Sequence, residues 1–192
     1  MPTESVSEAE RIIFASDERL KSVLERARQD AYGRGHRAVM SAHVALALLD
    51  DRDVNFFMHQ YADELPGIRQ KIHSHLKTAT PYFGNLTEIE MEELPQSPGL
   101  NNIMQQAAMI AHGNKKSAIS PMHVLHALMK QSEGQGLKVL HDAGVTETAV
   151  SEYIDSYEQE PMSPSERKRS AQAADKAQGF KIYPSGKALE SY

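Results

Sequence analysis

The sequence contains no cysteine and no tryptophan, and only five Phe and seven Tyr occur among its 192 residues. Without cysteine the chain has no disulfide framework and no thiolate to serve as a nucleophile or metal ligand. Its longest apolar run, residues 44–49, is far shorter than the roughly 20 residues that cross a bilayer. The first ten residues are polar and acidic, without the basic and apolar regions of a secretory signal. These absences predict a soluble, cytoplasmic protein with no membrane partner.

An excess of basic residues is also missing. The chain has 21 Lys and Arg against 26 Asp and Glu, for a net charge of −5. Proteins that bind nucleic acid usually carry a basic surface, because neutralising phosphates supplies much of the affinity. We therefore expect no nucleic-acid partner.

An internal duplication is the most informative feature of the sequence. Residues 20–49 align without a gap on residues 100–129, at an offset of 80. Nine of the thirty positions are identical, where chance gives about two. Most matches are apolar or small, as expected for two copies that share a packing scheme. The identical pairs are Leu20 and Leu100, Ala27 and Ala107, Ala31 and Ala111, Gly33 and Gly113, Ala38 and Ala118, His43 and His123, Val44 and Val124, Ala47 and Ala127, and Leu48 and Leu128.

Each copy begins with a helical pattern. Apolar residues recur at i, i+3, i+4, i+7 and i+11 from Leu20 and again from Leu100, which forms one stripe of an amphipathic helix. Gly33 and Gly113 follow the stripes, and we expect them to end the helices in the left-handed conformation. A second helix then starts. In the second copy Ser120 is the predicted N-cap and Pro121 the first helical residue. In the first copy Ser41 is the predicted cap.

Weaker helical patterns complete each copy. They cover residues 54–61 and 65–76 in the first copy and residues 136–141 and 147–157 in the second. Four helices per copy predict an all-α fold of two tandem four-helix repeats, about eight helices in total. We divide the chain into an extension (1–16), a first repeat (17–77), a joining loop (78–98), a second repeat (99–157) and a flexible tail (158–192) rich in Pro, Ser, Ala and Gln.

The strings VMSAHVALALL (residues 39–49) and ISPMHVLHALM (residues 119–129) resemble the repeated core of the Clp N-terminal domain, closest to the ClpA and ClpC group. The resemblance implies two repeats related by a pseudo-two-fold axis. It also implies a non-enzymatic module that binds substrates and adaptor proteins above a hexameric ATPase ring, which in some machines feeds a peptidase. Residues 187–192 resemble the start of the first ATPase module, so ATP and Mg²⁺ are expected only downstream of this chain.

Two departures from the family pattern limit what the resemblance carries. Family members often place a Glu before the repeated His, but Ala42 and Met122 stand here. Recognition through acidic residues at those positions is therefore not expected. Near one adaptor-contact region the chain has Arg37 rather than an acidic residue. The resemblance thus predicts the fold without identifying the partner.

No catalytic, cofactor or metal site is predicted. Gly186–Lys187 lacks the spaced glycine and the hydroxyl of a phosphate-binding loop. His123 and His126 are three apart and could share a helix face, but no third ligand stands nearby. Since His43 and His123 occupy equivalent positions, we expect each to bond a local group in its own repeat. His73 and His75 are two apart and point in different directions on a helix.

Four groups of residues are candidates for protein contact. Tyr32, Arg34, His36 and Arg37 form a basic and aromatic turn, which is either solvated or an adaptor contact. Tyr82 and Phe83 either plug the seam between the repeats or anchor a bound peptide. The acidic segment from Glu88 to Glu93 is either a solvated face or a docking edge for a basic partner. Met58 and Met122 are either core residues or adaptable contact surface.

The sequence therefore predicts the substrate- or adaptor-docking module of a Clp-type unfoldase, monomeric when isolated. Two alternatives remain open. One is a free-standing helical protein that regulates such a machine, and the other is an enzyme such as a metal-dependent hydrolase.

Overall fold

The computed structural model of the protein describes residues 16–62, 64–78, 90–131 and 135–157. In these ranges the chain forms eight α-helices and one short 3₁₀-helix, and the predicted all-α class is confirmed. The elements are α2 (Glu18–Gly33), α3 (Ser41–Leu48), α4 (Arg52–Tyr61), α5 (Leu65–Thr78), η1 (Met91–Glu93), α6 (Pro98–Gly113), α7 (Pro121–Lys130), α8 (Gln135–Asp142) and α9 (Glu147–Tyr157).

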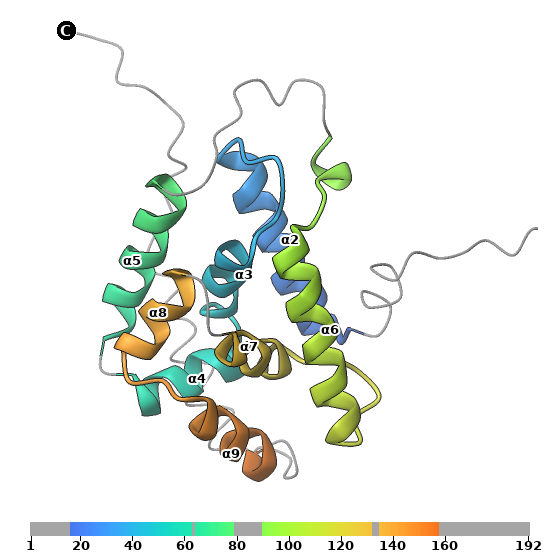
Figure 1. Cartoon of the computed structure of the whole chain (residues 1–192), viewed down its shortest axis with the longest axis vertical. Helices are drawn as coiled ribbons and strands as arrows, with labels where there is room; N and C mark the ends of the chain where they lie inside the picture. Colours follow the sequence, from blue (N-terminus) through green and yellow to red (C-terminus); the bar gives the residue numbers. More distant parts are fainter. Residues whose placement is uncertain (1–15, 63, 79–89, 132–134, 158–192) are drawn as a thin grey trace, which may run out of the picture.

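Two helices form the centre of the fold. In α3 every residue from Ala42 to Leu48 is buried, and in α7 every residue from Pro121 to Met129 is buried. A helix that is covered on all sides belongs in the core. The two helices contact each other, and Figure 1 shows the remaining helices arranged around them. Burial of Met58 and Met122 places both methionines in this core.

The identical apolar positions of the two central helices are buried to the same degree. Val44 on α3 and its equivalent Val124 on α7 have no exposed surface, and the same holds for Leu48 and Leu128. The two pairs stand 80 residues apart in the chain, so each repeat contributes the same side chains to the core. This burial agrees with the expectation that the repeats share a packing scheme.

The first helix of each repeat packs a single stripe against the centre. The α2 stripe and its equivalent on α6 are buried at every predicted position. Each fully buried leucine contributes roughly 1.5–3 kcal/mol to folding. The helices contact mainly their own repeat's central helix, α2 with α3 and α6 with α7. The stripe residues are Leu20, Val23, Leu24, Ala27 and Ala31 on α2, and Leu100, Ile103, Met104, Ala107 and Ala111 on α6.

Backbone bonds between the repeats are reciprocal. Val39 in the first repeat bridges Gln96, and Ser16 bridges Ile119. Adding 80 to residues 16 and 39 gives residues 96 and 119, so each bridge is the image of the other with the two repeats exchanged. The Asp17 N–H donates to the Ile119 carbonyl at 3.0 Å, whereas that of Ser97 donates to the Val39 carbonyl at 2.9 Å. Such a reciprocal pair of contacts is expected when the two repeats are related by a pseudo-two-fold axis.

The helix starts agree with the predictions in one repeat and differ in the other. Ser120 is the N-cap of α7 and Pro121 its first residue, as predicted. In α3 the N-cap is Met40, so the predicted capping role of Ser41 is wrong: Ser41 is already helical. Methionine offers no oxygen to the first turn. The cap is completed instead by a histidine side chain that bonds back to the Met40 N–H, as described below.

The helix ends correct a second prediction. Gly33 and Gly113 are the last residues of α2 and α6, and neither has a positive φ. The left-handed positions are two residues later, at Gly35 (φ 75°) and Lys115 (φ 58°), which are 80 residues apart. In each turn the left-handed residue bonds back three residues, to the carbonyl of Tyr32 or His112. The next amide bonds back five residues to the last alanine of the stripe, which completes a Schellman motif.

A charged network joins the starts of α2 and α4. Arg19 Nε donates to Asp51 Oδ2 at 3.0 Å, Nη2 donates to Asp51 Oδ1 at 2.5 Å, and the same guanidinium pairs with Asp53. Asp51 is buried and also caps α4, because its Oδ1 accepts from the backbone N–H groups of Asp53 and Val54. The buried carboxylate is therefore supplied with donors on both oxygens, which offsets the cost of removing it from water.

Among the helices of the described segments, none is both long and apolar enough to span a bilayer. Residues 79–89 of the joining loop and the tail from residue 158 onward lie outside the described residues.

Candidate docking site

The predicted contact turn is built into the first repeat. Tyr32, Arg34, His36 and Arg37 lie at the end of α2 and in the turn that leads to α3. The Schellman motif reverses the chain here, so that His36 points inward and is only 4% exposed. Arg37 is exposed and Tyr32 half-buried. The structure thus divides the predicted cluster into residues that face inward and residues that face solvent.

Arg34 is engaged within the fold. Its Nε donates to Asp30 Oδ2 at 2.7 Å, one turn earlier on α2. Its Nη2 lies 2.6 Å from His73 Nδ1 on α5. Since a guanidinium only donates, His73 Nδ1 is the acceptor and the proton of this neutral imidazole is on Nε2. Arg34 therefore fixes the end of α2 to α5 rather than extending toward a partner.

His36 and His43 form a buried pair in which the backbone determines the proton positions. The Met40 N–H donates to His43 Nδ1 at 2.9 Å, so this nitrogen carries no proton. His43 Nε2 therefore carries the proton and donates to His36 Nδ1 at 2.8 Å. A proton added to either of the two accepting nitrogens would face another N–H. The geometry consequently requires both rings to be neutral.

The electrostatics of the cluster favour the same state. Burial lowers the pKa of His43 to about 4, and the charge of Arg34 adds to this effect while Asp30 opposes it. Burial, with Arg34 as the next cause, also lowers the pKa of His36 and of His73. At neutral pH the cluster thus holds three neutral imidazoles, each accepting a hydrogen bond on its unprotonated nitrogen, and one guanidinium paired with Asp30.

The second repeat keeps the histidine and loses the rest of the cluster. His123 Nδ1 accepts from the Ser120 N–H at 3.0 Å, and the Ser120 hydroxyl lies 2.8 Å from the same nitrogen. Both repeated histidines thus make the local bond that their equivalent positions predict. At the positions of Asp30, Arg34 and His36, the second repeat has the residues Ile110, Asn114 and Lys116.

Only some of the other predicted contact residues lie in the part of the chain that the structure describes. Tyr82 and Phe83 lie outside the described residues, as do the first two residues of the acidic segment. Glu90, Glu92 and Glu93 are exposed around η1, which contacts α2. Their exposure fits both interpretations of the segment, a solvated face and a docking edge for a basic partner.

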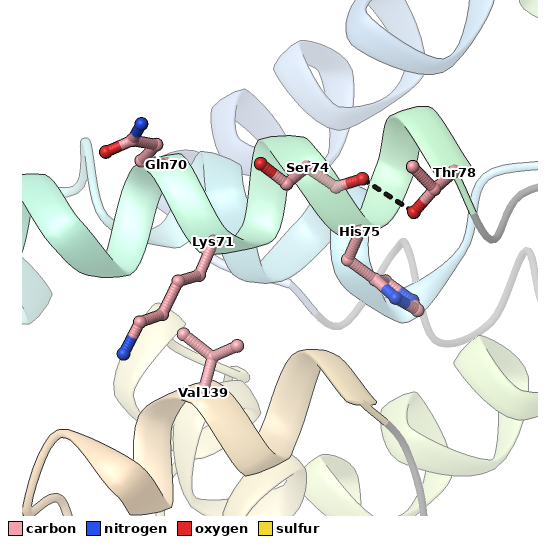
Figure 2. A pocket seen from close by; sticks show the side chains of 6 residues that line it. All are labelled: Gln70, Lys71, Ser74, His75, Thr78 and Val139. Atoms are coloured by element: carbon pink, nitrogen blue, oxygen red, sulfur yellow. Dashed lines mark hydrogen bonds between the residues drawn. The ribbon is translucent and has the colours of Figure 1, made fainter.

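A groove between the two repeats was not predicted from the sequence. It lies between α5 of the first repeat and α8 of the second, which contact each other, and has a volume of about 470 Å³. Five of its lining residues form two adjacent stripes on α5, and Val139 lines it from α8. Figure 2 shows Lys71 and Val139 pointing into the space between the two helices. The α5 residues are Gln70, Lys71, Ser74, His75 and Thr78.

Metal ligands do not gather in the part of the chain that the structure describes: no three His, Asp or Glu side chains lie close enough to hold an ion. His126 lies 3.5 Å from Glu147 on α9, and burial lowers its pKa although Glu147 opposes the shift. With His123 buried in its capping bond, the two histidines of α7 serve separate local contacts.

Part of the sequence matches the model of a known protein family. The family model for the Clp repeat (R) N-terminal domain matches residues 95–179, which contain the second repeat and run past residue 157. No curated protein sequence matches the chain.

Several solved structures share the fold. The N-domain of ClpV from Vibrio cholerae has a TM-score of 0.64 at 19% identity, over 78% of this chain and 89% of its own. The Hsp104 N-terminal domain from Candida albicans has a TM-score of 0.61 at 17% identity, over 73% and 89%. A ClpV N-domain solved in complex with a VipB peptide has a TM-score of 0.61 at 15% identity, over 78% and 91%. The chain has the Clp N-domain fold, and because ClpV and Hsp104 domains share it, the fold does not single out the predicted ClpA and ClpC group.

Proposed function

We propose that this chain is the substrate- or adaptor-docking module of a Clp-type, ATP-dependent unfoldase, and that it is not an enzyme itself. The observation that carries the proposal is the match of the second repeat to the Clp repeat family. The fold supports it, because two similar repeats contact each other through reciprocal backbone bridges. The buried histidines His36, His43 and His123, together with Arg34 and Asp51, are engaged in capping, ion pairing and packing. What such a molecule offers a partner is its surface.

Peptide binding supports the same proposal. A ClpV N-domain with this fold has been solved with a bound VipB peptide. By analogy we propose that the present chain binds a segment of a substrate or adaptor protein. A module of this kind needs only modest affinity, because tethering it near the entrance of a ring raises the local concentration of whatever it holds. The tail from residue 158 is the proposed tether, and ATP and Mg²⁺ belong to the proposed ATPase module that follows it.

The narrower assignment is also a proposal. The repeated strings around His43 and His123 favour the ClpA and ClpC group, whereas the structural neighbours include ClpV and Hsp104. The proposed docking role does not depend on which of these groups the attached ring belongs to.

Removal of the domain from the intact protein tests the proposal. Residues 17–157 are deleted in the natural full-length protein, and basal ATP hydrolysis and substrate unfolding are measured with substrates trapped by a hydrolysis-deficient variant. We expect ATP hydrolysis to continue and the unfolding of at least some trapped substrates to slow. Unchanged unfolding of every trapped substrate contradicts a docking role.

The alternative is a free-standing helical protein that regulates a Clp machine in trans. The natural reading frame separates the two: a stop codon directly after Tyr192 favours the alternative, whereas a frame that continues into a nucleotide-binding motif favours the proposed module. The enzyme alternative requires stoichiometric metal in the purified protein, which elemental analysis measures directly.

A further inference from the structure

Helix α5 has an unusual charge composition for this protein. From Leu65 to Thr78 it contains no Asp or Glu, whereas two lysines, one arginine and two histidines fall within nine residues. The whole chain carries more acidic than basic residues, with a net charge of −5. α5 is therefore a local basic strip on an acidic protein.

Only part of this strip is used inside the fold. Arg69 pairs with Asp50 at 2.5 Å and bonds the Leu49 carbonyl, and His73 accepts from Arg34. Lys71 and Lys77 are exposed and form no ion pair with any residue that the structure describes. A lysine without a local carboxylate keeps its full charge available to a ligand.

The unused side of the strip opens on the α5–α8 groove. Gln70, Ser74 and Thr78 recur every four residues and line one stripe, while Lys71 and His75 form the adjacent stripe toward α8. Residues four apart stand one above the other on a helix. The stripe from Gln70 to Thr78 is about 12 Å long at 1.5 Å per residue, which matches about four residues of an extended peptide.

The lining is complementary to an anion and not to a cation. None of the six lining residues is acidic, and they combine a lysine and an imidazole with the Ser74 hydroxyl and the Gln70 amide, both of which can donate to a carboxylate, whereas the Thr78 hydroxyl donates to the Ser74 carbonyl at 2.9 Å. The charged groups of α8 nearby in sequence to Val139 are Lys138, His141 and Asp142, of which only Asp142 is acidic.

We propose that the α5–α8 groove binds an acidic segment, rich in Asp and Glu, of a substrate or adaptor protein. This assignment rests on the proposed docking function and names the chemistry of one class of partner. Lys71 supplies the central cation, the Gln70 and Ser74 side chains bond the peptide's carboxylates, and Val139 provides the apolar floor. Since the site combines parts of both repeats, it exists only when the two repeats are packed together.

The test uses the 192-residue chain, labelled with ¹⁵N, and a fluorescein-labelled twelve-residue peptide of alternating Asp, Glu and Ser. A matched peptide with Asn and Gln in place of the acids is the ligand control. We expect the acidic peptide to bind more weakly as salt rises and to shift amide signals of Gln70, Lys71, Ser74 and His75. We expect the neutral peptide to leave these signals in place.

Two charge reversals locate the site. Lys71→Glu is expected to weaken binding of the acidic peptide roughly 3- to 10-fold, the effect of replacing an exposed ion pair by a repulsion. Lys21→Glu makes the same change of charge on α2, which lies outside the groove, and is expected to leave the affinity unchanged. Thermal unfolding of both variants checks that each is folded, and the wild-type signal shifts test the site independently of any variant.

The proposal is overturned by equal binding of the two peptides, by signal shifts that map to another face, or by equal losses in the two variants. Binding of a twelve-residue RNA at the same signals, or concentration-dependent self-association through the groove, would overturn the assignment to an acidic protein segment. In each of these cases the domain-deletion result still decides the docking function separately.

Discussion

Lys115 occupies the same left-handed turn position that Gly35 occupies eighty residues earlier. A side chain at positive φ is strained by roughly 1–2 kcal/mol, whereas glycine is not. We expect Gly35→Ala to lower the free energy of unfolding by about 1 kcal/mol and Lys115→Gly to raise it by about 0.5–1 kcal/mol. Urea unfolding followed by circular dichroism measures both changes.

Gly33→Ala is the matched control for this prediction. Gly33 is helical, and a Cβ added there meets no atom within 4 Å. Alanine is the better helix former by roughly 0.8–1 kcal/mol in a helix interior, so this variant is expected to be neutral or slightly more stable. A loss of stability in Gly33→Ala equal to that in Gly35→Ala would contradict the turn geometry.

The His36–His43 pair predicts a dependence of stability on pH. In the folded state burial lowers the pKa of His43 to about 4, whereas an unfolded histidine titrates near 6.5. The unfolded chain therefore binds protons that the folded chain excludes as the pH falls through 6.5. The contribution of His43 to the free energy of unfolding is therefore fully present above pH 6.5. It is lost as the pH falls from 6.5 toward 4, by up to about 3 kcal/mol. Chemical denaturation across this pH range measures the decline.

A substitution within the pair tests the origin of this decline. His43→Gln removes the titrating ring and is expected to flatten the pH dependence, while lowering stability at pH 7.5 by about 1–3 kcal/mol because the Met40 N–H loses its partner. His112→Gln removes an exposed histidine from α6 as the control. If the two variants show the same pH dependence as the wild type, the paired histidines are not its source.

Asp51 predicts a graded loss of stability. Its carboxylate caps α4 and accepts two bonds from Arg19, whose guanidinium also pairs with Asp53. Asp51→Ala removes the cap and leaves Arg19 with Asp53 alone, which is expected to cost about 2–3 kcal/mol. Asp51→Asn keeps an oxygen for the cap and is expected to cost about half as much. Equal losses in the two variants, measured by thermal unfolding, would show that the cap contributes little.

The reciprocal bridges predict a pattern of hydrogen exchange. The amides of Asp17, Val39 and Ser97 bond carbonyls of the other repeat or of the segment that leads into it. We expect all three to exchange slowly, with protection that depends on denaturant as strongly as that of the core helices, because opening any of them separates the repeats. Fast hydrogen exchange at the amide of Asp17 or Ser97 would show that these backbone hydrogen bonds do not hold the repeats together.

Much of the fold follows from the sequence because both repeats show the same apolar period. Leu20 and Leu100 mark the buried stripes, and Ser120 with Pro121 marks a helix start, since these features act locally along one helix. The left-handed position was misplaced because the two repeats share a glycine at Gly33 and Gly113, whereas the position that needs one is occupied by Lys115 in the second repeat.

The parts that sequence could not predict depend on how the helices pack. The bond between His36 and His43 crosses a turn whose direction periodicity does not specify. The groove beside Lys71 and Val139 lies between helices of different repeats, far apart in sequence, so no local pattern signals it. The absence of acidic residues on α5 was the one sequence feature that could have directed attention to that face.

The central claim, that this chain captures partners for an attached ring, is tested most directly by the dependence of unfolding rate on substrate concentration. The intact protein is compared with the variant that lacks residues 17–157, using one substrate from the trap experiment. A tethered docking module predicts that the deletion raises KM and leaves kcat and basal ATP hydrolysis unchanged, because only local substrate concentration is lost. An unchanged KM with a reduced kcat would contradict the account.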